Sequence, residues 1–566
     1  MKLLQFSTVA ALALSCLAVN AGDWSRFRGP DGSGVASDSE SLPTMWSPSA
    51  NLAWKTEMPG PGASSPIIVG DKAFVTCYSG YGLTQEAPGE IENLVRHLVC
   101  VDLKTGKVAW KKDVKVSLPE DPYTGIGVTA HGYASHTPVS DGANVYAFFG
   151  KSGVHAFDME GNKLWQADVG KESDPAKWGS SSSPIVHGGT VIVTASAESQ
   201  SIIAFDKTSG KEVWRQEAEG LDGMWGTPTL VKVDETRTDL VMCVAKELWG
   251  LDPVTGAMRW YADATGAEQA YSSVILDGKR VFAFTGRGGG SVAVDAGGSG
   301  NISETNTVWT GSETSSFASP VRHGSSVYIV TRGVVTVVDQ TTGKKVSQMR
   351  LSGAQQTGGR FGSLDYPSPV VVGDRMFYMN GSGQMFVFDL TGEIKQVAVN
   401  RVTTDKEIFW GSPAVSNGNM VIRSAKYLYC VADKGETVDP DAVVVAGAEP
   451  EAPAAARGGS GGGNRQRFDP AAMFNGMDKD KDGLVTEAEL EGNRMAERLM
   501  TLDTDSDKKI SKAEFTKGIS TLFSRGGSRS GGGRSGGRSG GGGSYGGRGN
   551  DSRPDRPQRP KMASEK

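Results

Sequence analysis

The chain has 566 residues, a length that excludes a single small core and indicates two to four domains. Its 76 glycines predict many tight turns, a low-complexity segment, or both. The net charge of −5 excludes no class of partner, but the charge is unevenly distributed. Residues 468–523 carry 12 acidic and 8 basic side chains, whereas residues 525–566 carry 10 basic and 3 acidic ones. We therefore expect an acidic module followed by a basic tail.

Residues 1–21 are predicted to be a signal peptide. A positive start at Lys2 is followed by an apolar run, and Val19-Asn20-Ala21 provides a small-residue cleavage site. A membrane anchor is the alternative, but the run is short for a bilayer span of about 20 residues. The sequence therefore predicts an exported protein, periplasmic or secreted, without a transmembrane segment. Lipid attachment at Cys16 remains a second alternative.

Four cysteines remain after cleavage: Cys77, Cys100, Cys243 and Cys430. They form no Cys-x-x-Cys motif, so neither a thioredoxin-like site nor a c-type haem is indicated. Cys77 and Cys100 fall on strands expected to be neighbours. A disulfide between these two residues and a pair of buried free thiols are both open interpretations.

Between residues 50 and 435 the chain repeats itself with a period of roughly 43–56 residues, which is typical of propeller blades. Each repeat opens with a small polar residue, in most cases before Pro, and continues into a short hairpin. These openings are Ser65-Pro66, Thr137-Pro138, Ser183-Pro184, Thr227-Pro228, Ser273-Val274, Ser319-Pro320, Ser368-Pro369 and Ser412-Pro413.

The second landmark of the repeat is an apolar strand that ends in Asp, a Thr-Gly type turn, and a strand that often carries Trp. The clearest copy runs from Val99 to Trp110. Asp and Gly suit the turn because they supply a side-chain acceptor and a positive φ. The Trp is expected to fill the gap between neighbouring blades.

Counting the strands predicts an all-β, eight-bladed propeller over residues 51–433. The eighth repeat has an inner strand at Tyr427–Val431 but no outer strand after Asp433. Asn51-Leu52-Ala53-Trp54-Lys55 looks like an outer strand with no blade before it. We expect this segment to complete the eighth blade, so that the two ends of the repeat close the ring and hide its edges.

These motifs resemble the PQQ-type propeller repeat, a family that includes BamB-like outer-membrane assembly factors and quinoprotein dehydrogenases. The opening Trp24-Ser25-Arg26-Phe27-Arg28-Gly29-Pro30, in an N-terminal extension over residues 22–50, is similar to exported BamB-like proteins. In the dehydrogenase relatives a vicinal cysteine pair, a Trp and a calcium site hold the cofactor. This sequence has no Cys-Cys. The resemblance therefore implies a BamB-like scaffold, and PQQ is not expected.

A possible ligand rim follows from aromatic residues three positions before the start of five inner strands: Trp225, Tyr271, Phe317, Tyr366 and Trp410. Basic residues recur in turns expected on the same face: Lys151, Lys246, Arg287, Arg332 and Lys426. One interpretation is a rim that binds an anionic, peptide or sugar ligand by stacking and charge. The other is that the aromatics wedge between blades and the cations are solvated. His131 and His136 share a loop but lack a third metal ligand.

A calcium-binding loop is predicted at residues 478–489, in an EF-hand pair over residues 468–523. Calcium takes about seven oxygen ligands, which such a loop supplies from positions 1, 3, 5, 7, 9 and 12. The expected ligands are Asp478, Asp480 and Asp482, the Leu484 carbonyl, Thr486 and both oxygens of Glu489. Gly483 permits the sharp turn at position 6.

A second loop at residues 503–514 offers Asp503, Asp505, Asp507, the Lys509 carbonyl, Ser511 and Glu514. Lys508 stands at position 6 in place of Gly, and a non-Gly residue at positive φ costs roughly 1 kcal/mol. We expect weaker binding in this loop. Residues 434–467 are predicted to be a flexible linker and residues 524–566 a disordered Gly/Arg-rich tail.

The sequence thus predicts an exported, non-catalytic docking protein, BamB-like in envelope assembly, with no catalytic residues and with calcium as its metal. The alternatives are a quinoprotein-like oxidoreductase of the envelope and a calcium-dependent surface adhesin. The expected partner is a protein or a surface polymer and not a specific nucleic acid, and the chain is expected to be a monomer.

Overall fold

The computed structural model describes residues 22–36, 41–84, 87–122, 132–175, 177–286, 289–355, 366–438, 474, 477–480, 482–490, 499–505, 507–517, 558–560 and 562. The signal-peptide prediction, Arg287, His131 and most of the basic tail lie outside these residues. The chain divides into two compact units, residues 1–448 with 553–566, and residues 449–552. No helix among the described residues is long and apolar enough to cross a membrane.

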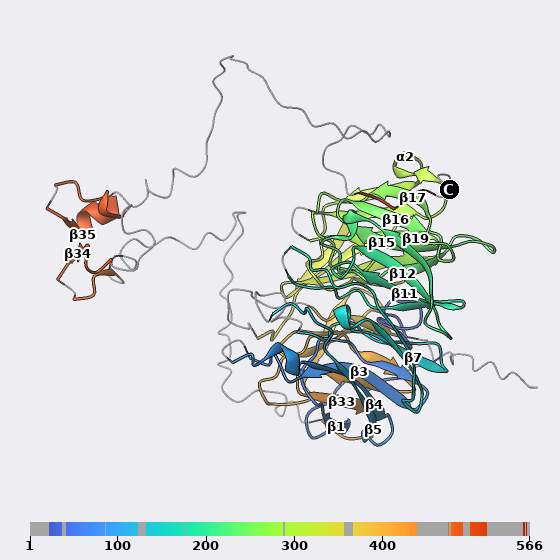
Figure 1. Ribbon diagram of the computed structural model, residues 1–566. Coiled ribbons are helices and arrows are strands. Elements are labelled where there is room, and N and C mark those ends of the chain that lie inside the picture. The colour runs from blue at the N-terminus through green and yellow to red at the C-terminus, as the bar shows by residue number, and fades with distance from the viewer. Residues whose placement is uncertain are drawn as a thin grey trace, which may run out of the picture. The chain divides into compact units, whose positions relative to one another are not determined.

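The larger unit is the predicted eight-bladed propeller, because its strands form eight sheets among the described residues (Figure 1). Each sheet has four antiparallel strands, and that of blade four has a short fifth strand. Blade one contains β2 (Ile67–Val69), β3 (Lys72–Ser79), β4 (Val95–Asp102) and β5 (Val108–Lys115). Blade two contains β6 (Val139–Ser140), β7 (Asn144–Phe148), β8 (Val154–Asp158) and β9 (Lys163–Ala167). Blade three contains β10 (Ile185–His187), β11 (Thr190–Ala195), β12 (Ser201–Asp206) and β13 (Glu212–Glu217).

Blade four contains β14 (Thr229–Lys232), β15 (Thr238–Val244), β16 (Glu247–Leu251) and β17 (Met258–Asp263), with β21 (Gly300–Asn301) added in parallel to β17. Blade five contains β18 (Ile275–Asp277), β19 (Arg280–Phe284), β20 (Ser291–Asp295) and β22 (Thr307–Gly311), with the short helix α2 (Ser303–Asn306) before β22. Blade six contains β23 (Val321–His323), β24 (Ser326–Thr331), β25 (Val334–Asp339) and β26 (Lys345–Arg350). Blade seven contains β27 (Val370–Val372), β28 (Arg375–Met379), β29 (Met385–Asp389) and β30 (Lys395–Asn400).

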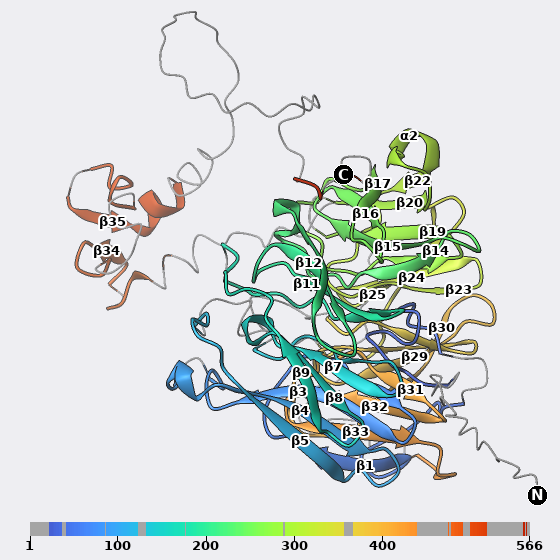
Figure 2. The ribbon, with the colours of Figure 1, turned by 45° about the vertical axis from the view of Figure 1, so that its right-hand side comes forward.

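Blade eight is assembled from both ends of the repeat, as the sequence predicts. Its strands are β31 (Ala414–Ser416), β32 (Asn419–Arg423), β33 (Tyr427–Ala432) and, from the start of the propeller, β1 (Leu52–Glu57). β1 pairs antiparallel with β33, with Trp54 opposite Cys430 (Figure 2). This pairing closes the ring and gives the outer edge of β33 a partner strand.

The small polar residue that opens each repeat links its blade to the next. The hydroxyl of each Ser or Thr accepts a hydrogen bond from the backbone N–H of its counterpart in the preceding blade. All eight bonds are 2.8–3.0 Å long, in the order Ser65→Thr137→Ser183→Thr227→Ser273→Ser319→Ser368→Ser412→Ser65. We call this closed circle the hydroxyl ring. It satisfies buried N–H groups that no strand partner could reach.

The outer-strand Trp side chains bridge neighbouring blades, as predicted. At five junctions the indole N–H donates to a backbone carbonyl in the next blade's Asp-Gly turn: Trp54 to Leu103, Trp110 to Met159, Trp165 to Lys207, Trp214 to Pro253 and Trp309 to Gln340. The turn glycine leaves room for the ring, since a Cβ at Gly106 would lie 2.6 Å from Trp54 Cγ. Blade four differs, because Trp260 Nε1 donates to Asp239 of its own blade at 2.7 Å.

The N-terminal extension crosses the central channel. Trp24 pairs with Ile68 of blade one, and Ser25 O accepts from Ser140 N of blade two. Further along the extension, Ala36 N donates to Val371 O of blade seven. The extension also contacts blade six, which stands opposite blade two in a ring of eight, through Arg28 and Pro320 O. A segment with bonds on opposite sides of the ring lies within the channel, where it covers inner sheet edges that have no strand beside them.

The four described cysteines are free and buried, so the alternative of a Cys77–Cys100 disulfide is wrong. The register explains why: Cys100 lies opposite Phe74, and Cys77 lies opposite His97. The two thiols therefore occupy different rungs of the ladder between β3 and β4. Burial raises the pKa of Cys100 to about 12, which keeps this side chain a neutral thiol.

The smaller unit has its own apolar core among the described residues. β34 (Leu484–Thr486) and β35 (Lys509–Ser511) pair antiparallel, with Val485 opposite Ile510. Both side chains are buried in a cluster with Phe474, Leu490, Leu499, Leu502 and Phe515. The two acidic loops are thereby joined at position 8 of each.

Candidate functional site

Four of the five predicted rim aromatics form a continuous row. Ring centroids lie 5.0 Å apart for Trp225 and Tyr271, 5.1 Å for Tyr271 and Phe317, and 4.7 Å for Phe317 and Tyr366. Trp178 extends the row, with its centroid 5.7 Å from that of Trp225. We call these five residues the aromatic row. Each is only partly buried, so the row offers apolar faces to solvent.

The residues of the row precede the innermost strands of blades three to seven, at the mouth of the channel. Its residues stack on one another, while the outer-strand Trp residues fill the gaps between blades. Trp225 Nε1 is fixed by Gly179 O at 2.9 Å. The fifth predicted aromatic, Trp410, has no ring contact with Tyr366 among the described residues, and its buried indole Nε1 has no hydrogen-bond partner there.

The basic residues predicted on this face differ in their surroundings. Lys151 is buried and pairs with Asp121 at 2.9 Å, and its Nζ donates to Ser173 at 2.7 Å. Lys246 pairs with Glu268 at 3.0 Å. Lys426 is exposed. Two of the cations are therefore neutralised by neighbouring carboxylates, and the described residues do not form a single basic ring around the mouth.

Two arginines of the N-terminal extension lie in the channel. Arg26 Nη2 donates to Pro228 O at 3.1 Å, and Arg28 Nη2 donates to Pro320 O at 2.5 Å. Burial lowers the pKa of Arg26 to about 10 and that of Arg28 to about 9. Among the described residues their Nε atoms have no hydrogen-bond partner. The channel side of the mouth is thus positively charged at neutral pH, a feature the sequence alone did not indicate.

A buried polar cluster joins blades two and three. Ser180 Oγ lies 3.0 Å from His136 Nε2 and 2.7 Å from Glu198 Oε1. Burial raises the pKa of Glu198 to about 7. The serine stands between the imidazole and the carboxyl group, whereas a nucleophilic triad requires the imidazole in the middle. The arrangement therefore does not match a nucleophilic triad.

A recess of about 590 Å³ lies between the outer parts of blades one and two. Lys112, Lys115 and Lys163 line it together with His155. The His155 ring lies with Nε2 2.9 Å from Ser152 O, and burial lowers the pKa of this imidazole to about 4. His155 is therefore neutral at physiological pH, and the charged residues of the lining are the three lysines and Asp113.

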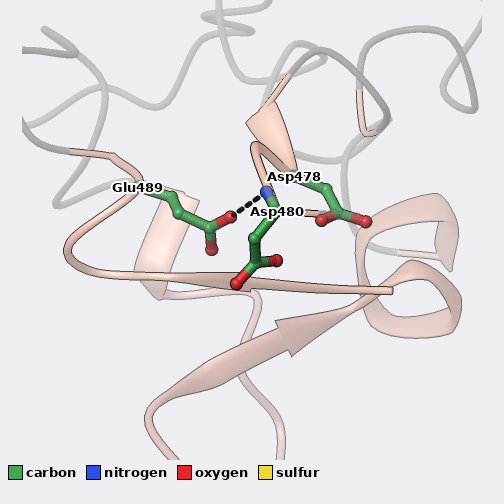
Figure 3. A group of neighbouring side chains, drawn as sticks. All are labelled: Asp478, Asp480 and Glu489. Carbon is green, nitrogen blue, oxygen red and sulfur yellow. Dashed lines mark hydrogen bonds between the residues drawn. The ribbon is translucent and has the colours of Figure 1, made fainter. Parts of the chain in front are cut away.

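The first acidic loop brings its side-chain oxygens together. Ligand atoms of Asp478, Asp480 and Glu489 lie within 4.8 Å of one another (Figure 3). Glu489 Oε1 accepts from the Lys479 and Asp480 backbone N–H groups, and Oε2 accepts from both the backbone N–H and the hydroxyl of Thr486. The Thr486 bonds are the largest cause of a Glu489 pKa lowered to about 2. Asp478 Oδ1 is buried without a hydrogen-bond partner among the described residues.

The second acidic loop repeats this geometry. Ligand atoms of Asp503, Asp505 and Asp507 lie within 4.8 Å of one another. Glu514 Oε2 accepts from the backbone N–H and hydroxyl of Ser511. Lys508 adopts a φ of 66°, close to the 87° of Gly483 at the equivalent position. The backbone turn is thus preserved although the residue is not glycine.

Comparison with known proteins places the propeller in a family. A family model described as outer membrane protein assembly factor BamB matches residues 95–348 and 198–441. The chain belongs to this family. The two matches overlap and together run from β4 of blade one to β33 of blade eight. No curated protein sequence matches the chain.

Solved structures give weaker similarities. BamB from Moraxella catarrhalis is 14% identical, with a TM-score of 0.46, covering 69% of this chain and 99% of its own. A europium-containing methanol dehydrogenase is also 14% identical, with a TM-score of 0.46, and the match covers 71% of this chain and 90% of the dehydrogenase. The quinohemoprotein alcohol dehydrogenase ADHIIG from Pseudomonas putida HK5 is 12% identical, with a TM-score of 0.45, covering 76% and 83%.

Proposed function

We propose that this protein is an exported, non-catalytic docking protein of the cell envelope, with a BamB-like role in outer-membrane assembly. The aromatic row carries the proposal. Partly exposed rings held in fixed contact across several blades provide a rigid apolar surface, and aromatic anchors of this kind dominate the energetics of protein interfaces. A protein segment is therefore the partner that this face suits best.

Two features favour docking over quinone chemistry. The N-terminal extension occupies the channel, where its arginines bind blade carbonyls. The four cysteines are buried on separate strands, and none is adjacent to another in sequence. The chain therefore lacks the vicinal cysteine pair that holds the cofactor in the dehydrogenase relatives.

Photo-crosslinking in the producing cells tests the docking proposal. A photoreactive residue placed at Phe317 is expected to give a discrete adduct with an envelope protein. Trp225→Ala with Tyr271→Ala should reduce that adduct at least tenfold, because the two substitutions remove the neighbouring stacked rings. Val213, which is 51% exposed on outer strand β13, provides the control position for the photoreactive residue. Adducts of equal yield at both positions would contradict the proposal.

A second experiment tests the quinoprotein alternative. Purified full-length protein incubated with PQQ and Ca²⁺ is expected to retain no quinone absorbance after desalting and to reduce no dye with alcohols. Retained absorbance with turnover would replace the docking proposal with an oxidoreductase.

We also propose that the two acidic loops bind Ca²⁺ as an EF-hand pair. Asp478, Asp480, Asp482, the Leu484 carbonyl, Thr486 and Glu489 would hold the first ion. Asp503, Asp505, Asp507, the Lys509 carbonyl, Ser511 and Glu514 would hold the second. The converging carboxylates and the buried Asp478 oxygen without a partner support hard oxygen coordination.

Calorimetric titration of the full-length chain with Ca²⁺ tests this second proposal. We expect a tighter and a weaker site, and Glu489→Gln should abolish the tighter one because it removes a bidentate ligand. Glu487→Gln, two residues away at a position that supplies no ligand, is the matched control and should leave both sites unchanged. Equal heats for the wild type and Glu489→Gln would refute the assignment.

A further inference from the structure

A short C-terminal segment lies against the outer part of blade four, beside β16 and β17 (Figure 1). Its described residues are Gln558, Arg559, Pro560 and Met562, which belong to the same compact unit as the propeller. They are reached only after the linker and the whole of the smaller unit. The contact therefore joins two parts of the chain that are about 300 residues apart in sequence: Arg559 and Glu247 are separated by 312 positions.

Arg559 and Glu247 form a bidentate ion pair. Arg559 Nε donates to Glu247 Oε2 at 2.7 Å, and Nη2 donates to Oε1 at 2.6 Å. The Glu247 side chain is 1% exposed, and the indole N–H of Trp249 donates to its Oε2 at 2.9 Å. A carboxylate buried to this extent strongly favours a guanidinium that can meet both oxygens at once.

The face of the guanidinium also stacks on an aromatic ring. The Arg559 carbon Cζ lies 3.5 Å from the centroid of the Tyr261 ring, a stacked cation–π arrangement. Lys could satisfy neither this stacking nor the bidentate geometry in the same way. The site formed by Glu247, Trp249 and Tyr261 is therefore specific for arginine.

Backbone contacts fix the direction of the segment. Gly220 N–H donates to Gln558 O at 3.1 Å, and Met562 forms a parallel bridge with Met258 at the start of β17. Pro560 is buried, and Met562 packs against the apolar cluster that contains Met258 and Trp249. We call the surface formed by Gly220, Glu247, Trp249, Met258 and Tyr261 the blade-four groove.

The sequence of the segment suits an extended ligand. Arg-Pro occurs three times with a spacing of three residues, at Arg553-Pro554, Arg556-Pro557 and Arg559-Pro560. Three residues is the period of the polyproline II helix, so such a repeat presents its arginines on one face with little loss of entropy on binding. Neither the groove nor this repeat has a role in closing the propeller.

We propose that the blade-four groove is a binding site for arginine-proline peptides and that its occupant is this chain's own C-terminal segment. Docking of the segment attaches residues 449–552 to the propeller at both ends. The covalent link gives the segment a high effective concentration at the groove, on the order of millimolar for flexible tethers, so it competes with any free peptide of the same kind.

The test uses the full-length chain and a fluorescein-labelled synthetic peptide of residues 550–566, with fluorescence anisotropy as the readout. In one variant Arg553, Arg556 and Arg559 are all replaced by Ala, which frees the groove from the segment. We expect this variant to bind the peptide at least tenfold more tightly than the wild type does, because the wild-type segment competes. Adding Glu247→Gln to the variant should abolish binding.

Two controls keep the result specific. Glu268→Gln removes an exposed carboxylate from a neighbouring loop and should leave peptide binding unchanged. If Glu247→Gln impairs folding, Tyr261→Ala tests the groove from its stacking side and should weaken binding at least tenfold. A peptide in which all three Arg are Lys should bind at least tenfold more weakly than the native one.

Three results would overturn the inference: equal peptide binding by the wild type and the triple variant, binding that Glu247→Gln and Glu268→Gln affect equally, or a wild-type dimer in sedimentation that the triple variant does not form. The last would show that the segment docks on a second copy. None of these measurements depends on the aromatic row or on calcium.

Discussion

The inner and outer ends of the blades are joined in different ways. At the inner end the hydroxyl ring makes the same bond at every junction, with lengths of 2.8–3.0 Å. At the outer end the Trp contact occurs at five junctions, and Trp260 of blade four bonds to its own blade instead. A buried backbone N–H group needs a hydrogen-bond acceptor, so every inner junction has the same hydroxyl contact. The outer edge has no such requirement, so its contacts vary between blades and include the blade-four groove.

Removing the indole that closes the ring should have the largest effect. Trp54→Ala is expected to lower the free energy of unfolding by about 3–5 kcal/mol, since it leaves a cavity against Gly106 and deprives Leu103 O of its donor. Denaturant unfolding followed by circular dichroism measures the change. Val213→Ala, on an exposed outer-strand position, should stay within about 0.5 kcal/mol. Similar losses for both variants would mean that the outer contact does not stabilise closure.

The buried carboxyl group of Glu198 should make stability depend on pH. Burial raises the pKa of Glu198 from 4.5 to about 7, so the folded chain holds a proton that the unfolded chain releases. Stability from this group is therefore complete below pH 4.5 and falls as pH rises towards 7, by about 3 kcal/mol. The difference between wild type and Glu198→Gln across this range isolates the effect. A difference independent of pH would contradict it.

Breaking one bond of the hydroxyl ring should cost less than removing Trp54. Ser412→Ala leaves the buried N–H of Ser368 without its acceptor and is expected to lower stability by about 1–3 kcal/mol. Ser412→Thr is the matched control, because Thr137 and Thr227 serve as acceptors in the same ring. Equal free energies of unfolding for Ser412→Ala and Ser412→Thr would contradict this prediction, because the hydroxyl contact would then contribute nothing to stability.

The two acidic loops show the same contrast between a fixed conformation and a variable residue. Lys508→Gly should tighten Ca²⁺ binding in the second loop about fivefold, because Gly removes roughly 1 kcal/mol of strain at positive φ. Lys508→Ala removes the same charge but keeps the strain, so it separates the two causes. Titrations in a Glu489→Gln background isolate the second loop. An equal gain for Ala and Gly would assign the effect to charge.

The features that repeat could be predicted from the sequence. The eight copies of the Ser/Thr opening predicted the number of blades. The strand around Trp54, which has no blade before it, predicted how the ring closes. Both patterns could be recognised because each blade needs the same residue types at the same positions. Four members of the aromatic row were predicted for the same reason, and Trp178 was not. The fifth predicted rim aromatic, Trp410, has no ring contact with Tyr366 among the described residues, since spacing along the chain fixes a position in the blade but not the direction of the ring.

The features that occur once could not be predicted. The disulfide alternative failed because register decides which residues face one another, and register depends on the hairpin turn. Arg28 and Arg559 contact residues 292 and 312 positions away, and nothing near them in sequence marks those partners. Glutamate is usually a surface residue, so the sequence did not single out Glu198 or Glu247. Burial in the fold raises the pKa of Glu198 and places Glu247 where it pairs with Arg559.

The N-terminal extension has a consequence for the order of assembly. Its residues bond to the innermost strands of blades one, two and seven and to residues just before those of blades four and six, and these blades surround one channel only when the ring exists. The arginines therefore reach their carbonyl partners after the blades have gathered around them. A protease that cleaves near Arg26 would distinguish chains that have completed this last step from chains that have not.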